Sequence, residues 1–124
     1  MMIAKQENKD LLHGSLKISE DRVGEVKKQM KSDKVMIDLA ATFKVLGDPT
    51  RTKIIFALSK KVLCVNEIAV LLNISQSAVS HQLRILRNMA LVQCRRDGKT
   101  SYYSLEDVHI KFLLKEGLKH VAEG

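Results

Sequence analysis

Apolar residues recur every three or four positions along most of the chain, which is the spacing of helices that bury one face. The pattern predicts helices over residues 19–30, 32–46, 50–59, 65–72, 76–89 and 107–121. Residues 1–18 do not follow it, so we expect a flexible N-terminal arm ahead of one domain over residues 19–124. Gly47-Asp48-Pro49 separates two of the helices, because Gly favours a helix C-terminus and Pro the first turn of the next helix.

The apolar positions of the central helices predict an aliphatic core. The expected buried residues are Ile54, Ile55, Leu58, Ile68, Ala69, Leu71, Leu72, Val79, Leu83, Leu86 and Ala90. The last four share one face of the helix 76–89, within about 60° of one another at ~100° per residue. An apolar stripe also follows the helix 32–46, at Met36, Leu39, Ala40, Phe43 and Leu46.

Two segments near residue 100 have the character of β-strands. Residues 91–96 and 99–105 flank Asp97-Gly98, a strong hairpin signal because Gly tolerates positive φ. A short helix, a tight turn and an amphipathic helix, followed by a hairpin, form the pattern of a winged helix-turn-helix. We therefore predict a mainly α fold with a β-hairpin wing, in which residues 65–89 form the helix-turn-helix and residues 91–105 the wing.

Composition narrows the function classes. The chain has 124 residues, 45% hydrophobic and 4% aromatic, which suits one helical domain with an aliphatic core. No apolar run approaches the roughly 18 residues of a membrane span, and the first residues have no secretory signal. With only two cysteines, Cys64 and Cys94, these features predict a cytoplasmic protein with reduced thiols and no membrane partner.

The formal net charge of +7 is unevenly distributed along the chain. Residues 75–103 carry five basic side chains and one acidic one, whereas residues 104–124 carry three basic and four acidic ones. A basic window over the predicted helix-turn-helix and wing indicates a nucleic-acid partner. The alternatives are a solvated basic face and a surface that binds an acidic protein.

Duplex DNA would meet the polar face of the helix 76–89 and the wing. Gln and Ser side chains can read base edges in a major groove, and Arg and Lys can hold phosphates. The candidate DNA-binding residues are Gln76, Ser77, Ser80, His81, Arg84, Arg87, Arg95, Arg96 and Lys99. The sequence has no His-Glu-x-x-His motif, no Gly-rich phosphate loop and no nucleophile-and-base signature, so we expect neither an enzyme nor a small-molecule substrate.

Histidines and carboxylates at both ends of the last helix are donor types that suit Zn(II). Asp107 and His109 lie at its start, and His120 and Glu123 near its end. One ion cannot join the two ends within a chain, because the 11 residues from His109 to His120 span about 16 Å of helix. Either the two ends serve separate purposes, or two such helices pack antiparallel across a two-fold axis and complete two identical sites. The second arrangement requires Asp107 at the N-cap, because within a helix it would point about 160° away from His109.

Five short segments carry a family resemblance: Val45–Arg51, Leu63–Ile68, Ser75–Arg87, Arg96–Lys99 and Tyr102–Leu105. Through them the stretch from Leu39 to Glu123 resembles the ArsR/SmtB family of metal-sensing winged helix-turn-helix repressors, and its zinc- and cobalt-sensing branch in particular. The resemblance implies a homodimer formed through the N-terminal and C-terminal helices. It also implies that the metal-free dimer binds operator DNA and that Zn(II) releases it, so that metal efflux or sequestration genes are expressed.

The resemblance further implies which residues bind the metal. The ligands of that branch match Asp107, His109, His120 and Glu123, two from each protomer at each site. The second ring nitrogen of His120 would donate to the backbone carbonyl of His81 and link the ion to the DNA-reading helix. Co(II), Cd(II) and Ni(II) are alternatives to Zn(II).

A second metal site is a further alternative, formed by His13, Cys64 and Glu67. The arsenic, cadmium and lead sensors of the family use a Cys-x-Cys pair in this region, and here Asn66 stands where the second cysteine would be. A small buried thiol without a ligand role is the competing interpretation of Cys64.

Overall fold

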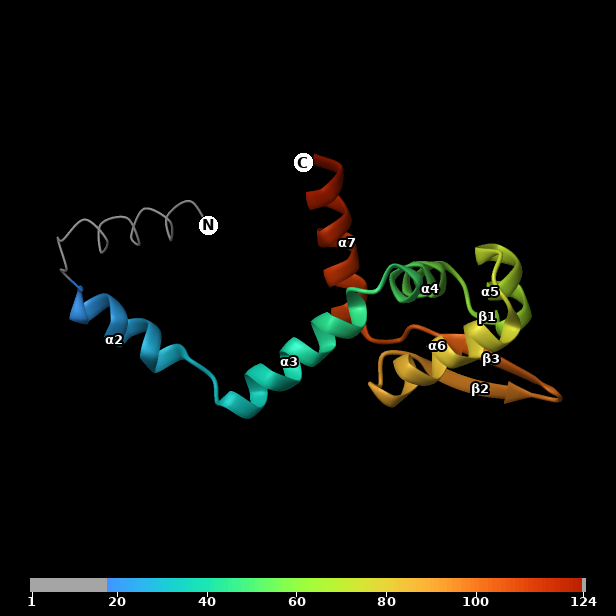
Figure 1. Ribbon diagram of the computed structural model, residues 1–124, viewed down its shortest axis with the longest axis horizontal. Coiled ribbons are helices and arrows are strands. Elements are labelled where there is room, and N and C mark those ends of the chain that lie inside the picture. Colours follow the sequence, from blue (N-terminus) through green and yellow to red (C-terminus); the bar gives the residue numbers. More distant parts are fainter. Residues whose placement is uncertain (1–17, 124) are drawn as a thin grey trace. The chain divides into compact units, whose positions relative to one another are not determined.

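The structure is a computed structural model that describes residues 18–123. Its contacts divide the chain between Met36 and Ile37 into two units, and each unit is described here by itself (Figure 1). The predicted N-terminal arm lies almost entirely outside the described residues, and a single domain over residues 19–124 stays a prediction. None of the described helices combines the length and the hydropathy that crossing a membrane requires.

The first unit holds α2 (Glu20–Gln29) and the beginning of α3 (Asp33–Leu46), as the apolar spacing predicted. Ser19 caps α2, because its hydroxyl accepts a hydrogen bond from the backbone N–H of Arg22 at 3.2 Å. The Ser32 hydroxyl accepts from the backbone N–H of Val35 at 3.3 Å in the same way at the start of α3. Local capping chemistry therefore sets both helix starts.

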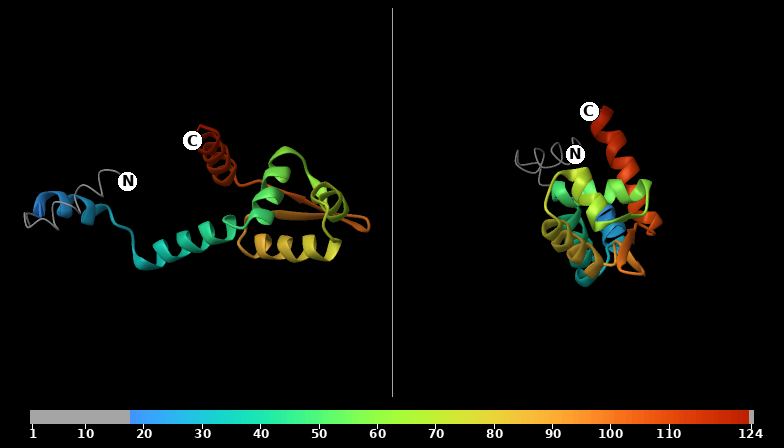
Figure 2. Two further views of the ribbon diagram at one scale, coloured as in Figure 1. Left: turned by 45° about the horizontal axis from the view of Figure 1, so that its top comes forward. Right: turned by 90° about the vertical axis from the view of Figure 1, so that its right-hand side faces the viewer.

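The second unit contains the predicted helix-turn-helix, wing and closing helix (Figure 2). Its remaining elements are α4 (Pro49–Lys60), β1 (Leu63–Cys64), α5 (Val65–Leu72), α6 (Gln76–Asn88), β2 (Gln93–Asp97), β3 (Thr100–Ser104) and α7 (Val108–Glu123). The strands form one antiparallel sheet in the order β1-β3-β2. The mainly helical fold with a β-hairpin wing is thus confirmed, with the addition of the two-residue strand β1, which was not predicted.

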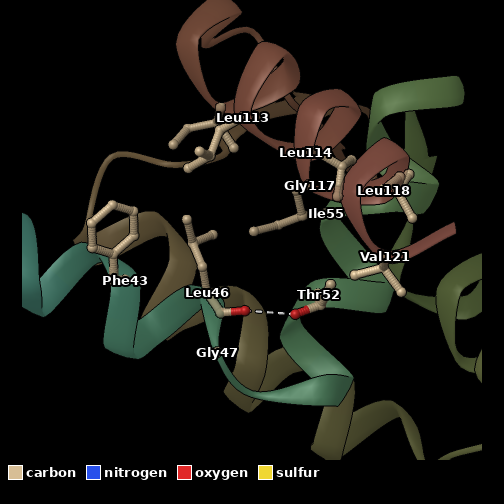
Figure 3. A pocket seen from close by; sticks show the side chains of 11 residues that line it. Phe43, Leu46, Gly47, Thr52, Ile55, Leu113, Leu114, Gly117, Leu118 and Val121 are labelled. Carbon is tan, nitrogen blue, oxygen red and sulfur yellow. Dashed lines mark hydrogen bonds between the residues drawn. The ribbon is translucent and has the colours of Figure 1, made fainter. Parts of the chain in front are cut away.

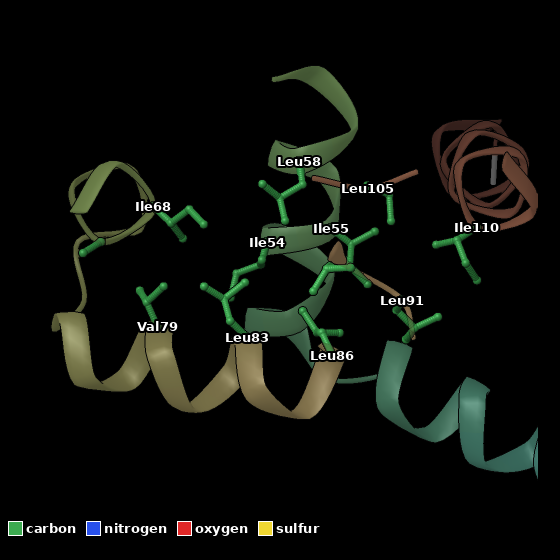
Figure 4. Close-up of a cluster of buried hydrophobic side chains, with 12 residues drawn as sticks. Ile54, Ile55, Leu58, Ile68, Val79, Leu83, Leu86, Leu91, Leu105 and Ile110 are labelled. Carbon is green, nitrogen blue, oxygen red and sulfur yellow. The ribbon is translucent and has the colours of Figure 1, made fainter. Parts of the chain in front are cut away.

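Aliphatic side chains from α4, α5 and α6 form the core (Figure 4). Val79, Leu83 and Leu86 point from α6 towards α4, and Leu86 is 0% exposed. Leu105 and Ile110 extend the core to the entry of α7. The predicted apolar face of α6 is therefore the face that holds α6 on the rest of the unit.

Two predicted core residues are exposed, and a third, Leu72, is half-buried. Leu71 is 59% exposed, because α5 has only eight residues and contacts its neighbours through Ile68 and Ala69. Ala90 lies beyond the end of α6 with a positive φ of 57° and is exposed, so it no longer shares the face of Leu86. At Ala90 the helical projection was wrong because it extended a regular helix past the point where the backbone changes, whereas Leu71 lies within α5 on a side that the core does not cover.

The hairpin turn is also displaced by one residue from the predicted one. Asp97 pairs with Thr100 across the ladder, so the two turn residues are Gly98 and Lys99, not Asp97 and Gly98. Gly98 has a φ of 65°, which a residue without Cβ adopts at little steric cost. Lys99 consequently sits at the tip of the wing.

Candidate functional site

The turn between α5 and α6 sets the start of α6. Asn73 takes the left-handed conformation, with φ 55° and ψ 48°, and ends α5. The backbone N–H of Ile74 donates to the carbonyl of Ala69 at 3.2 Å, which closes the turn. Ser75 then caps α6, because its hydroxyl accepts from the backbone N–H of Ala78 at 3.1 Å.

The polar face of α6 is exposed along its whole length. All six candidate residues of this helix are exposed: Gln76, Ser77, Ser80, His81, Arg84 and Arg87. They lie beside and opposite the buried positions of the helix and include two positive charges. The arrangement offers a polar helical surface that a major groove of about 12 Å width can admit.

The wing presents its basic residues near a tight tip. Arg95, Arg96 and Lys99 are all exposed, and Arg96 Nε donates to the backbone carbonyl of Gly98 at 3.3 Å. Arg95 pairs with Tyr102 and Arg96 with Ser101 in the ladder. Because successive strand residues face opposite sides of a sheet, Arg95 and Arg96 lie on different faces of the wing. The two arginines therefore cannot contact DNA from the same face of the wing.

Tyr103 connects the wing to the end of α6 electrostatically. Burial raises the pKa of Tyr103 above its ordinary value near 10, and a hydrogen bond and charge interaction with its ladder partner Cys94 raise the pKa further. The Arg87 guanidinium acts in the opposite direction on the same pKa. A candidate phosphate-binding residue of α6 thus lies within electrostatic reach of the wing strand β3.

The closing helix begins at a capped aspartate. Asp107 precedes α7, and its Oδ1 accepts from the backbone N–H of His109 at 2.8 Å and of Ile110 at 3.2 Å. The predicted N-cap position of Asp107 is confirmed. Capping uses one carboxylate oxygen, and a carboxylate has two oxygens with about four lone-pair sites, so Asp107 retains capacity to bind a cation.

The other three candidate ligands lie along an exposed helix. His109, His120 and Glu123 are all exposed on α7. Within residues 18–123, no group of three or more histidine, cysteine, aspartate or glutamate side chains could hold a metal ion. That finding agrees with the helix length, which separates His109 from His120 by about 16 Å. A site built from these residues needs a second chain.

Cys64 and Glu67 are close neighbours at the start of α5. The Glu67 carboxylate accepts from the backbone N–H of Cys64 at 3.0 Å, which serves the helix start. Cys64 and Cys94 both have free thiols and are half-buried. His13 lies outside the described residues, so the structure brings together two of the three residues of the alternative second site.

An apolar surface runs beside the candidate metal ligands. A groove of about 400 Å³ is lined by α3, α4 and α7, with Phe43, Leu113 and Val121 among its walls (Figure 3). Of the residues that line it, Phe43 is 51% and Val121 75% exposed. Contiguous exposed apolar surface of this kind marks an interaction site.

One interhelical contact had no local sequence signal. Arg51 lies in the first turn of α4 and hydrogen bonds to Gln82 in α6, 31 residues further along the chain. In the sequence, the segment Val45–Arg51 stood out through the helix break at Gly47-Asp48-Pro49 and through its family resemblance, and neither indicates this contact. A pairing across 31 residues leaves no periodicity from which it could be found.

Comparison with known proteins identifies the family. The profile described as bacterial regulatory protein, arsR family, matches residues 48–93. The cadmium resistance transcriptional regulatory protein CadC homolog of Staphylococcus aureus is 40% identical over 107 residues, which cover 86% of this chain and 88% of the relative. The transcriptional repressor SmtB homolog of Synechocystis is 41% identical over 103 residues, covering 83% of this chain and 78% of the relative.

A solved structure shares the architecture. It is a homodimeric winged helix-turn-helix DNA-binding domain from Mycobacterium bovis, with a TM-score of 0.65 and 25% identity, covering 76% of this chain and 89% of that one. The residues matched by the family profile include α4, α5 and the capped helix α6, and end at the first residue of β2. The chain belongs to the arsR family of bacterial regulatory proteins and is a winged helix-turn-helix transcriptional regulator.

Proposed function

We propose that this regulator is a zinc-responsive repressor. The metal-free homodimer binds operator DNA in the cytoplasm through α6 and the wing, and Zn(II) at the C-terminal helices releases the DNA. Genes whose products export or sequester the metal are then expressed. The relatives support the coarser part of this proposal, since two are named as a repressor and as a cadmium resistance regulator.

The observation that carries the proposal is the division of the candidate ligands between the two ends of α7. Asp107, as the N-cap, and His109 lie at the start of this 16-residue helix, and His120 and Glu123 lie near its end. A two-fold axis that brings two such helices together antiparallel would join opposite ends and create two identical sites. The exposed apolar surface of α7 and α3 supports such a dimer, because it would be covered there.

The donor set fits Zn(II). Two imidazole nitrogens and two carboxylates provide four ligands of the types that zinc binds tetrahedrally. The capping hydrogen bonds hold Asp107 at the helix start, and the exposed imidazoles of His109 and His120 can be approached by an ion. When bound, the ion would supply a fixed cross-link between the two helices.

To regulate DNA binding, zinc bound at α7 must affect the DNA-reading helix α6. The proposed link is a hydrogen bond from the second ring nitrogen of His120 to the backbone carbonyl of His81 in α6, as metal-bound histidines commonly donate their other N–H. Both residues are exposed. Coupling of this kind is worth typically 1–3 kcal/mol, or a change in affinity of about 5- to 150-fold.

DNA binding with and without zinc tests the proposal. We expect the metal-free protein to bind DNA from upstream of its own gene in a fluorescence anisotropy titration, and zinc to weaken binding at least fivefold. His120→Ala should retain DNA binding and lose the zinc effect, whereas the control Lys119→Ala should behave as the wild type. Zinc-independent binding would contradict the regulatory mechanism, and no binding would favour a basic module that recognises an acidic protein.

Mixing two variants tests whether each site spans two protomers. Protomers with Asp107→Ala and His109→Ala, or with His120→Ala and Glu123→Ala, should each form homodimers that lack both sites. A heterodimer of the two restores one complete site and leaves the other without ligands. Zinc titration should therefore recover one tight site per heterodimer, and recovery of none would contradict the split site.

A second candidate keeps the DNA-binding function and changes the metal. The Staphylococcus aureus relative is named for cadmium resistance, and Cys64 and Glu67 are brought together at the start of α5. In this candidate, Cd(II), Co(II) or Ni(II) binds at the helical site and releases the DNA. Alternatively, a softer site with Cys64 and His13 binds the metal and has the same effect. Cys64→Ser separates the candidates, because it should leave release by zinc unchanged and abolish release through a thiol site.

A further inference from the structure

Arg51 lies in the first turn of α4, and its guanidinium hydrogen bonds to two other segments of the second unit. Its Nε donates to the backbone carbonyl of Val45 in the last turn of α3 at 2.8 Å. Its Nη1 donates to the side-chain oxygen of Gln82 in the middle of α6 at 3.1 Å. The backbone N–H of Arg51 donates to the capping carboxylate of Asp48 at 3.0 Å. The end of α3, the start of α4 and the recognition helix thus meet at one half-buried side chain.

This contact differs in kind from the other attachments of α6. Among residues 18–123, it is the one hydrogen bond that joins a side chain of α6 to another helix. The remaining attachment is apolar contact through Val79, Leu83 and Leu86, and such contact has no preferred direction. The planar guanidinium donates in fixed directions, so the bond to Gln82 restricts rotation of α6 about its own axis.

A small rotation would matter to DNA recognition. Side-chain ends lie about 6 Å from a helix axis, so a rotation of about 10° moves them by about 1 Å. Hydrogen bonds to base edges require donor–acceptor distances within about 2.7–3.2 Å. Gln82 follows His81 directly and lies within three residues of Ser80 and Arg84, which places the restraint beside the candidate base-reading residues.

We infer that Arg51 is a positioning residue for DNA recognition, which fixes the rotation of α6 relative to the α3–α4 junction through Gln82. The inference rests on the DNA-binding part of the proposed function. It assigns Arg51 no contact with DNA. Phosphate contacts stay with the exposed basic residues of α6 and the wing.

The test compares operator DNA with DNA of unrelated sequence for Arg51→Met, Gln82→Met and the double variant. We expect each single variant to lose about tenfold in operator affinity, and unrelated DNA to be bound as by the wild type. The double variant should be no weaker than either single one, because both remove the same bond. Lys53→Met removes the same charge from an exposed position of α4 and should leave operator affinity unchanged.

Salt dependence distinguishes positioning from direct phosphate contact. If Arg51 positions α6, the slope of log affinity against log salt concentration should equal that of the wild type in Arg51→Met. A slope reduced by about one would overturn the inference, because it indicates a lost phosphate contact. Additive losses in the double variant, or full operator affinity in Gln82→Met, would overturn it as well.

Two further measurements separate a positioning role of Arg51 from a loss of stability and from a loss of charge. Gln82→Met leaves the bond from Arg51 to Val45 in place, so it should unfold at nearly the wild-type temperature while operator affinity falls. Arg51→Lys keeps the charge without the forked donor geometry and should recover only part of the operator affinity. A wild-type protein that does not bind its operator would refute the proposed function itself, and this inference with it.

Discussion

Asp107 carries two proposed roles, and two substitutions separate them. Its Oδ1 caps α7 through the backbone N–H groups of His109 and Ile110. Its carboxylate is also a proposed zinc ligand. Asp107→Asn preserves a capping oxygen and removes the charge, whereas Asp107→Ala removes both.

The structure sets the expected size of the stability effect. Loss of a capping side chain costs about 1 kcal/mol, within a range of about 0.5–2. Loss of the charge alone removes the favourable interaction with the helix N-terminus, about 0.3–1 kcal/mol. Ile110 belongs to the core and is 8% exposed, so fraying of this turn also disturbs apolar packing. We expect Asp107→Ala to be the less stable variant by about 1 kcal/mol, or about 4 °C in Tm for a chain of this size.

Chemical unfolding in the presence of a chelator measures the capping role without metal, at one protein concentration for all variants. Zinc titration against a chromophoric competitor measures the ligand role, and both variants should bind zinc at least tenfold more weakly. Equal stability of the Asn and Ala variants would refute the capping argument. Wild-type zinc affinity in Asp107→Asn would refute the ligand assignment.

Three other predictions concern the core, the wing and its pH dependence. Leu86→Ala should lower the free energy of unfolding by about 2–5 kcal/mol, whereas Val70→Ala, at a position 83% exposed, should change it by less than about 0.5 kcal/mol in chemical denaturation. Lys99→Met should reduce the salt slope of DNA binding by about one without changing sequence preference, as measured by anisotropy from low to moderate salt. The raised pKa of Tyr103 means that the folded state favours the neutral phenol. The contribution of Tyr103 to the free energy of unfolding is therefore present below about pH 10 and is lost as the pH rises beyond it. Above about pH 10 the stability of Tyr103→Phe should consequently fall less than that of the wild type.

Local chemistry allowed much of the second unit to be predicted from the sequence. The two faces of α6 follow from the helical period. The N-cap position of Asp107 was a requirement of the split metal site, and Asp is a residue type that favours that position. Both depend on residues that are neighbours along one element. The same is true of the break at Gly47 and Pro49.

The features that escaped prediction are those that depend on distant residues or on irregular backbone. β1 has only two residues, which is too short for a period, and it exists because Leu63 and Cys64 pair with β3. Ala90 left the predicted face because the chain turns into the left-handed region there. The bond from Arg51 to Gln82 spans 31 residues and forms only once α4 and α6 pack together.

The central claim is that zinc and operator DNA oppose each other through α7 and α6, and reciprocity tests it most directly. The measurement is the zinc affinity of the dimer, free and saturated with operator DNA, in one buffer. If zinc weakens DNA binding by a given factor, operator DNA must weaken zinc binding by the same factor. Equal zinc affinities for the free and the DNA-bound dimer would contradict the account.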